Sequence, residues 1–204
     1  MITIVDYGLG NIRAFLNVYR RLNIEVRTAT NAAELAGATR IVLPGVGHFD
    51  HAMERLDRSG MRDTLEELVH TRGVPVLGVC VGMQILADSS QEGTRPGLGW
   101  IPGRVRAFSD WEPAQRLPMP HMGWNDVQPE SAGGLFAGME SECRFYFLHS
   151  YFFEPASADA SLATAQYGGK FSSAVHHGRI FGVQCHPEKS HRFGIRLLKN
   201  FAEI

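Results

Sequence analysis

The chain has 204 residues, of which 44% are hydrophobic and 20% charged, and this composition is typical of a folded domain, not a disordered segment. Twenty Lys and Arg residues against 21 Asp and Glu residues give a net charge of −1, which offers no overall attraction to nucleic acid or to an anionic membrane. The apolar runs are far shorter than the ~20 residues of a membrane span, and the N-terminus lacks the pattern of a signal peptide. Three cysteines are too few for a disulfide framework, so we expect a cytoplasmic protein.

The first 90 residues alternate short apolar runs with helical patterns. We expect strands at residues 2–6, 24–27, 41–43 and 74–79. Between them, apolar residues recur at helical spacing in residues 12–19, 32–36 and 53–69. Strand–helix alternation of this kind predicts right-handed parallel crossovers, with helices on both faces of a parallel sheet.

The pattern changes after Gly93, where Pro and Gly become frequent and helical periodicity fades. Short strand-like segments follow at residues 104–108, 144–148, 163–166, 173–176 and 180–184, and a helix is expected at 191–202. The predicted fold class is therefore α/β. We expect a single doubly wound domain over residues 1–204, with a mostly parallel central sheet and added antiparallel strands.

A candidate nucleophile lies where the strand at 74–79 meets the next predicted helix. The segment 78–82 reads Gly-Val-Cys-Val-Gly, the cysteine counterpart of the G-x-S-x-G elbow. Flanking glycines are expected in such a turn because a Cβ atom there would collide with nearby backbone. Cys80 would lie at a helix N-terminus, which favours a thiolate, and the N–H of Val81 would face a developing oxyanion. The other interpretation is a buried strand-end cysteine without a catalytic role.

A candidate base and its orienting carboxylate follow the last predicted strand. Period-2 alternation places His186 and Glu188 on one face and Cys185 on the other, which favours a core position for Cys185. A carboxylate can fix the tautomer of an imidazole whose other nitrogen faces a thiol. A zinc site is disfavoured, since the three cysteines and nine histidines show no C-x-x-C or H-x3–5-H pairing.

Five motifs together resemble a known family. The segments GVCVGMQ at 78–84 and QCHPEKS at 184–190 resemble the two signatures of class I, triad-type glutamine amidotransferases. Three more, PGVG at 44–47, PHMGWN at 120–125 and FYFLHSY at 145–151, are similar to the glutaminase subunits of imidazole glycerol phosphate synthase, of histidine biosynthesis. The resemblance spans essentially the whole chain. One departure is Cys185, where these proteins commonly carry phenylalanine, and we expect it to alter packing rather than chemistry.

The resemblance implies roles for individual residues. It implies hydrolysis of glutamine through a γ-glutamyl thioester on Cys80, with His186 as base and acid and Glu188 as its orienter. It implies an oxyanion hole at Val46, Gly47 and Val81. It also implies that glutamine is held by Gln84, Glu92, Ser150 and Tyr151. No cofactor and no metal are implied.

The resemblance further implies a heterodimer with the cyclase subunit of imidazole glycerol phosphate synthase. That partner would use the ammonia to make imidazole glycerol phosphate and AICAR from PRFAR. The face toward the partner and the ammonia exit would comprise His121, Met122, Trp124, Asn125, Tyr146 and Lys189. Two alternatives stay open: a paralogous glutaminase that supplies ammonia for amidination of surface sugars, and a scaffold of the same fold without catalysis.

Overall fold

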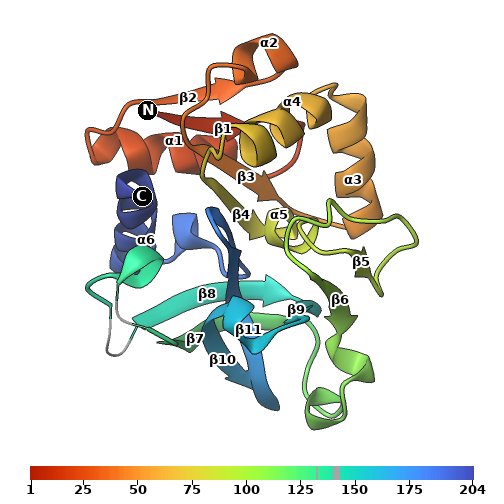
Figure 1. Ribbon diagram of the computed structural model, residues 1–204. Helices are drawn as coiled ribbons and strands as arrows, with labels where there is room; N and C mark the ends of the chain where they lie inside the picture. The colour runs from red at the N-terminus through yellow and green to blue at the C-terminus, as the bar shows by residue number, and fades with distance from the viewer. Residues whose placement is uncertain (132, 140–142) are drawn as a thin grey trace.

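The computed structural model describes residues 1–131, 133–139 and 143–204. This part of the chain forms a 12-stranded mixed sheet flanked by helices (Figure 1). The main path of the sheet has the strand order β2-β1-β3-β4-β12-β11-β10-β7-β8, and β5, β6 and β9 branch from it. The fold is thus a single α/β domain that joins a parallel region to an antiparallel one, as the sequence predicts.

The parallel region contains the strands predicted in the first 90 residues. These are β1 (Ile2–Val5), β2 (Val26–Ala29), β3 (Ile41–Gly45) and β4 (Val76–Cys80), joined by β12 (Ile180–Val183) from the far end of the chain. The strand expected at 24–27 lies two residues later, because Asn23 adopts a left-handed backbone (φ 56°) after the preceding helix and delays the extended conformation.

The helices of the parallel region are α1 (Ile12–Arg21), α2 (Ala32–Leu35), α3 (Phe49–Arg58), α4 (Arg62–Glu66) and α5 (Val81–Gln84). The helical pattern at 53–69 covers parts of α3 and α4 and a π-helical turn at Glu67–Thr71, so it is not one helix. The last helix, α6 (His191–Glu203), is present as predicted and packs beside α1 (Figure 1). Phe15 and Tyr19 of α1 and Phe201 of α6 are buried, and each phenylalanine contributes about 1.5–3 kcal/mol of burial free energy.

The antiparallel region contains β6 (Gly103–Ala107), β7 (His121–Pro129), β8 (Cys143–His149), β9 (Tyr151–Pro155), β10 (Ser161–Tyr167) and β11 (Gly169–His177), with the short β5 (Ser89–Ser90) at its edge. Periodicity alone misses β7 and β9. The segment of β7 contains Gly123, Asn125, Asp126 and Pro129, which are unfavourable in isolated strands. It is extended because it pairs with β8 on one side and β10 on the other.

The register of the parallel strands brings distant motifs to one edge of the sheet. Gly45 of β3 pairs with Cys80 of β4, and Val183 of β12 pairs with Val79. The carboxyl ends of these three strands, and the segments that follow them, therefore meet at one place, as is usual for sites on open α/β sheets. No helix in residues 1–131, 133–139 and 143–204 is long and apolar enough to cross a membrane.

Candidate active site

Cys80 lies in a strained turn between β4 and α5. Its φ of 55° and ψ of −115° are uncommon for a residue with a side chain and project the thiol out of the strand direction. A Cβ atom on Gly78 would lie 2.5 Å from the Gly82 carbonyl oxygen, and one on Gly82 would collide with the carbonyl oxygen of Leu43. The elbow therefore requires both glycines, as the sequence predicts. Because α5 has only four residues, the N–H of Val81 matters more than a helix dipole.

His186 and Glu188 are held together beside this cysteine. The Nδ1 atom of His186 lies 3.0 Å from Oε1 of Glu188, and both side chains are buried. Residues Pro187–Lys189 form a 3-10 turn, which corrects the extended segment expected from the alternation. The pair is nevertheless formed, because the turn folds Glu188 back onto the imidazole. Among the described residues, the second carboxylate oxygen of Glu188 has no hydrogen-bond partner, so the hydrogen bond of this carboxylate is the one to His186.

The protonation of His186 is set by two opposing effects. Burial lowers its pKa, but side-chain hydrogen bonds to Cys80 and Glu188, together with the charges of both, outweigh burial and raise the pKa to about 9. His186 therefore carries a proton at neutral pH. Its backbone is fixed as well, since its N–H donates to the Tyr146 carbonyl (2.8 Å) and its carbonyl accepts from the Ser190 hydroxyl (2.6 Å).

A cavity of about 300 Å³ brings Cys80 and His186 together with the predicted oxyanion and substrate residues. Its walls are formed by Val46, Gly47, Cys80, Val81, Gln84, Glu92, Pro120, Leu148, His149, Ser150, Tyr151, His186 and Lys189. Glu188 is not in the wall and contacts His186 from behind. A cavity of this size, with a few polar groups converging on it, is typical of a site for a small molecule.

The turn after β3 forms one wall of this cavity. Val46 is 41% exposed, and Gly47 has a φ of +98° with open space where a Cβ atom would lie, since no heavy atom is within 4 Å of that point. Gly45 is crowded instead: a Cβ there would lie 2.6 Å from the Gly82 nitrogen and 2.9 Å from the Tyr7 hydroxyl. The turn is therefore packed against the elbow at Gly45, whereas a side chain at Gly47 would meet only open space.

The residues expected to hold glutamine already have contacts within the chain. Glu92 accepts the N–H of Phe49 at 2.7 Å and so caps α3. Gln84 is buried and donates through Nε2 to the Tyr151 carbonyl (3.2 Å) and to Oε1 of Gln184 (3.0 Å). These contacts orient both side chains, and both still line the cavity.

The face expected to meet a partner is largely exposed. Met122 is 65% and Trp124 42% exposed; Trp124 stacks on His191, with ring centroids 5.3 Å apart. Lys189 Nζ lies 5.8 Å from the centroid of the Tyr146 ring. His121 requires a correction, because it is 4% exposed and stacks between Phe147 and Tyr167. Its side chain does not form part of the exposed face.

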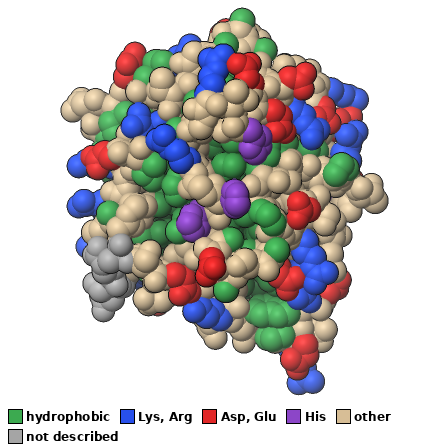
Figure 2. All heavy atoms as spheres, in the orientation of Figure 1, with side chains coloured by type: hydrophobic (Ala, Val, Ile, Leu, Met, Phe, Trp, Pro, Cys, Tyr) green, Lys and Arg blue, Asp and Glu red, His purple; other side chains and the backbone are tan. Residues whose placement is uncertain are grey.

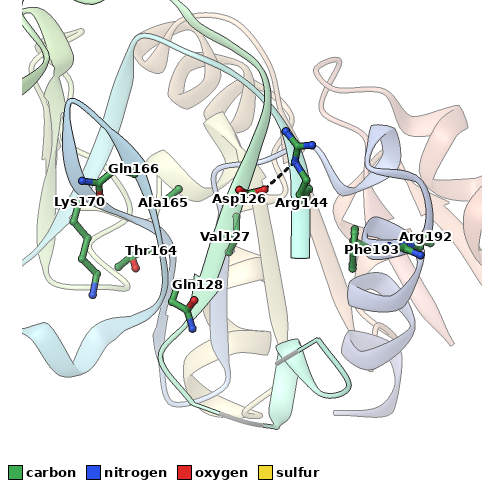
Figure 3. Close-up of a pocket in the computed structure, with 10 residues that line it drawn as sticks. All are labelled: Asp126, Val127, Gln128, Arg144, Thr164, Ala165, Gln166, Lys170, Arg192 and Phe193. Carbon is green, nitrogen blue, oxygen red and sulfur yellow. Dashed lines mark ion pairs between the residues drawn. The ribbon is translucent and has the colours of Figure 1, made fainter. Parts of the chain in front are cut away.

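A larger hollow, about 750 Å³, lies on β7, β8, β10 and α6 (Figure 3). Its charged lining includes an ion pair between Asp126 and Arg144 at 2.8 Å, and Lys170 at its rim pairs with Glu130 at 2.9 Å. Acidic and basic side chains are also intermixed on the face seen in Figure 2. The hollow has no cysteine in its lining and no group resembling the arrangement at Cys80, so the smaller cavity is the candidate active site.

The other two cysteines are buried away from solvent. Burial raises the pKa of Cys143 to about 11 and that of Cys185 well above its ordinary value. The core position predicted for Cys185 is confirmed. Within the described residues, no group of three or more His, Cys, Asp or Glu side chains could hold a metal ion.

Two residues of the site were missed by sequence reasoning. Tyr7 is buried, and its hydroxyl, which touches the turn at Gly45, has no hydrogen-bond partner among the described residues. Gln184 is completely buried and donates through Nε2 to Cys80 Sγ at 3.9 Å. A signal for Gln184 existed, since an amide at the end of a buried strand needs polar partners.

The fold, the elbow and the His–Glu pair define an α/β protein of the cysteine amidotransferase kind, and comparison with known proteins agrees. The family model described as glutamine amidotransferase class-I matches residues 3–204, so the chain belongs to the class I glutamine amidotransferases and is an enzyme of that kind. A crystal structure of a glutamine amidotransferase has a TM-score of 0.76 at 18% identity, covering 100% of this chain and 99% of that one. That likeness concerns the fold.

Curated relatives narrow the assignment within the family. The chain is 63% identical to the imidazole glycerol phosphate synthase subunit HisH of Bdellovibrio bacteriovorus and 49% identical to that of Leptospira interrogans, with 100% of each chain covered. It is 43% identical, at the same coverage, to a protein of Pseudomonas aeruginosa named imidazole glycerol phosphate synthase subunit HisH 2. The chain is thus a member of the HisH group of glutaminase subunits, which belong to histidine biosynthesis.

Proposed function

We propose that the chain hydrolyses glutamine with Cys80 as nucleophile, His186 as acid and base, and Glu188 as the group that orients His186. The observation that carries the proposal is the convergence of Cys80, His186 and the turn at 44–47 on one cavity. The contact of His186 Nδ1 with Glu188 Oε1 supports these roles, and so does the raised pKa of His186, to which Cys80 and Glu188 both contribute.

In the first half of the reaction, the sulfur of Cys80 attacks the carboxamide carbon of glutamine. The carbon–nitrogen bond breaks, a γ-glutamyl thioester forms, and ammonia leaves. His186 supplies the proton to the departing nitrogen, which agrees with its pKa of about 9. The oxyanion of the tetrahedral intermediate would be held by the N–H of Val81 and by backbone of Val46 and Gly47, which line the same cavity.

In the second half, the neutral His186 takes a proton from water. The resulting hydroxide attacks the thioester carbon, the carbon–sulfur bond breaks, and glutamate leaves. Gln84, Glu92, Ser150 and Tyr151 are proposed to hold the amino-acid part of the substrate throughout, since all four line the cavity. The cytoplasmic location expected from the sequence stays a prediction.

The proposed partner is the cyclase subunit of imidazole glycerol phosphate synthase, in a heterodimer through which ammonia passes to the cyclase. The names of the relatives support this partner. The exposed Met122 and Trp124, with Asn125, Tyr146 and Lys189, are the proposed contact face; Lys189 is also in the cavity wall. The partner would stimulate glutamine hydrolysis by reorienting the turn at Gly47, because glycine adopts alternative backbone conformations at little cost.

The test compares two nitrogen sources in the complex with the cyclase. Cys80→Ala should lower glutamine-dependent formation of imidazole glycerol phosphate by more than about 10³-fold, while ammonia-dependent formation stays near the wild-type rate. Cys185→Ala is the matched control, because it removes a buried cysteine outside the proposed chemistry. A glutamine-dependent rate near normal in Cys80→Ala would refute the nucleophile.

The same complex tests the partner. If glutamine is hydrolysed but no product forms with the cyclase, whereas a sugar-amidinating synthetase supplied in its place receives the ammonia, the glutaminase proposal stands and the partner is wrong. The rate of glutamine hydrolysis should be lowest in the free chain, higher in the complex, and highest in the complex with the acceptor substrate bound. Equal rates in all three would refute stimulation by the partner.

A further inference from the structure

A series of hydrogen bonds, buried at its centre, begins at the half-buried Asn125 of β7, next to the exposed Trp124. Nδ2 of Asn125 lies 3.2 Å from Nε2 of His121, and Nδ1 of His121 lies 2.8 Å from Nε2 of His149. Nδ1 of His149 in turn lies 2.8 Å from the Tyr151 carbonyl oxygen. Both histidines are buried and surrounded by aromatic rings, where hydrogen bonds are strong and unpaired polar groups costly.

In this series of hydrogen bonds, the hydrogen-bond partners of each imidazole nitrogen of His121 and His149 determine whether that nitrogen carries a hydrogen. The Tyr151 carbonyl can only accept, so His149 Nδ1 carries a hydrogen. Burial lowers the pKa of His149 to about 3 and that of His121 to about 4, so both rings are neutral at pH 7. His149 Nε2 then accepts from His121 Nδ1, and His121 Nε2 accepts from the Asn125 amide. The donors all point from β7 toward Tyr151.

A second set of hydrogen bonds continues from the same carbonyl to the nucleophile. The Tyr151 oxygen also accepts from Gln84 Nε2 at 3.2 Å, so its two acceptor positions are both used. The other hydrogen of the Gln84 amide reaches Gln184 Oε1 at 3.0 Å. This contact fixes which end of the Gln184 amide faces the nucleophile, and its Nε2 donates to Cys80 Sγ at 3.9 Å.

We infer that Gln184 is a positioning residue for the Cys80 sulfur and that His149 and His121 keep Gln184 in place from the β7 side. The inference rests on the proposed role of Cys80. A hydrogen bond from the Gln184 amide favours the thiolate and directs it toward the cavity. Loss of the His149 hydrogen leaves the Tyr151 carbonyl held by the Gln84 amide alone, so the carbonyl can shift and carry the Gln84 amide with it, which loosens Gln184 two contacts away.

The experiment measures the alkylation rate of Cys80 by iodoacetamide between pH 5 and 9 on the isolated full chain, with peptide mass spectrometry to locate the label. Gln184→Met removes the donor to sulfur at nearly constant volume. His149→Leu removes the histidine in the middle of this series of hydrogen bonds, and His149→Asn retains a donor in the position of Nδ1. Asn200→Leu is the matched control, because it loses buried hydrogen bonds to the Leu135 and Ala137 carbonyls that are not part of this series.

We expect Gln184→Met to slow alkylation at pH 7 by about threefold to tenfold, the worth of one hydrogen bond, and to move the rate–pH curve to higher pH. His149→Leu should move the curve in the same direction by less, and His149→Asn should restore most of the shift. Asn200→Leu should lower the thermal midpoint and leave the curve in place.

Two results would overturn the inference. One is an unchanged curve in Gln184→Met. The other is an unchanged curve in His149→Leu while Gln184→Met shifts, which would leave Gln184 isolated from the histidines. If His149→Leu does not fold, Asn125→Asp replaces it, because a carboxylate cannot donate to His121 Nε2 and should shift the curve as well. Alkylation reports on Cys80 whether or not glutamine is hydrolysed, so failure here is distinct from failure of the Cys80→Ala test.

Discussion

The first 83 residues and the rest of the described chain build the candidate site by different means. Residues 1–83 are all described, and apart from tyrosines their one buried polar side chain is that of Thr3. They present Cys80 through a backbone turn between two glycines. The rest of the described chain buries His121 and His149 on β7 and β8, and Gln184 and His186 after β12, each in hydrogen bonds. Backbone shape thus places the nucleophile, whereas side-chain hydrogen bonds tune the groups around it.

Gly82→Ala should give the largest loss of stability, because a Cβ there collides with backbone of β3, which cannot move without the sheet. We expect the free energy of unfolding to fall by at least about 3 kcal/mol, measured by urea denaturation. Gly37→Ala is the control: its Cβ would be 3.6 Å from Arg27 Nη2, an ordinary contact, so the change should stay within about 1 kcal/mol. Equal losses in the two variants would contradict the account of the elbow.

Glu188→Gln tests whether side-chain hydrogen bonds tune the groups around the nucleophile. The substitution keeps the shape of the side chain but removes the negative charge, 3.0 Å from His186 Nδ1, that orients the imidazole and stabilises its protonated form. We expect kcat for glutamine hydrolysis in the complex to fall by about 10²- to 10⁴-fold, with a smaller change in KM. A change in KM alone would instead assign Glu188 to substrate binding.

The pH dependence of stability should differ in sign between His186 and the His121–His149 pair. The pKa of His186 is raised from 6.5 to about 9, so its contribution is complete below about pH 6.5 and is lost as the pH rises through 9. The pKa values of His121 and His149 are lowered to about 4 and 3, so their contribution is lost as the pH falls from 6.5 toward those values. Urea denaturation across pH measures both slopes.

Variants at these histidines assign each slope to its residues. His186→Asn should flatten the alkaline slope and leave the acid one, and His121→Phe should do the reverse. A His121→Phe variant whose acid slope matches the wild type would show that the pair is not the source of that slope.

Tyr7→Phe should have the smallest effect. The Tyr7 hydroxyl is buried with no partner in the described part of the chain, so its removal leaves no group newly unpaired. We expect the free energy of unfolding to change by less than about 1 kcal/mol. Tyr19→Phe, which removes a similarly buried hydroxyl from α1, is the matched comparison. A loss in Tyr7→Phe far above that in Tyr19→Phe would show that the hydroxyl supports the turn at Gly45.

The same contrast explains how much the sequence could predict. The parallel strands, the elbow at Cys80 and the helix at the end of the chain follow from local periodicity and glycine spacing. The alternation also predicts the pairing of His186 with Glu188, though in an extended segment instead of a 3-10 turn. The extended conformation of β7 and the buried position of His121 could not be predicted, because both depend on pairing with β8 and β10, which local periodicity does not reveal.

The central claim is that Cys80 forms a covalent intermediate with glutamine, and acid quenching of the complex during turnover tests it most directly. Peptide mapping by mass spectrometry should find a γ-glutamyl adduct on the peptide that contains Cys80, and the adduct should be lost in Cys80→Ala. An adduct on Cys143 or Cys185, or steady hydrolysis of glutamine by Cys80→Ala at the wild-type rate, would contradict the account.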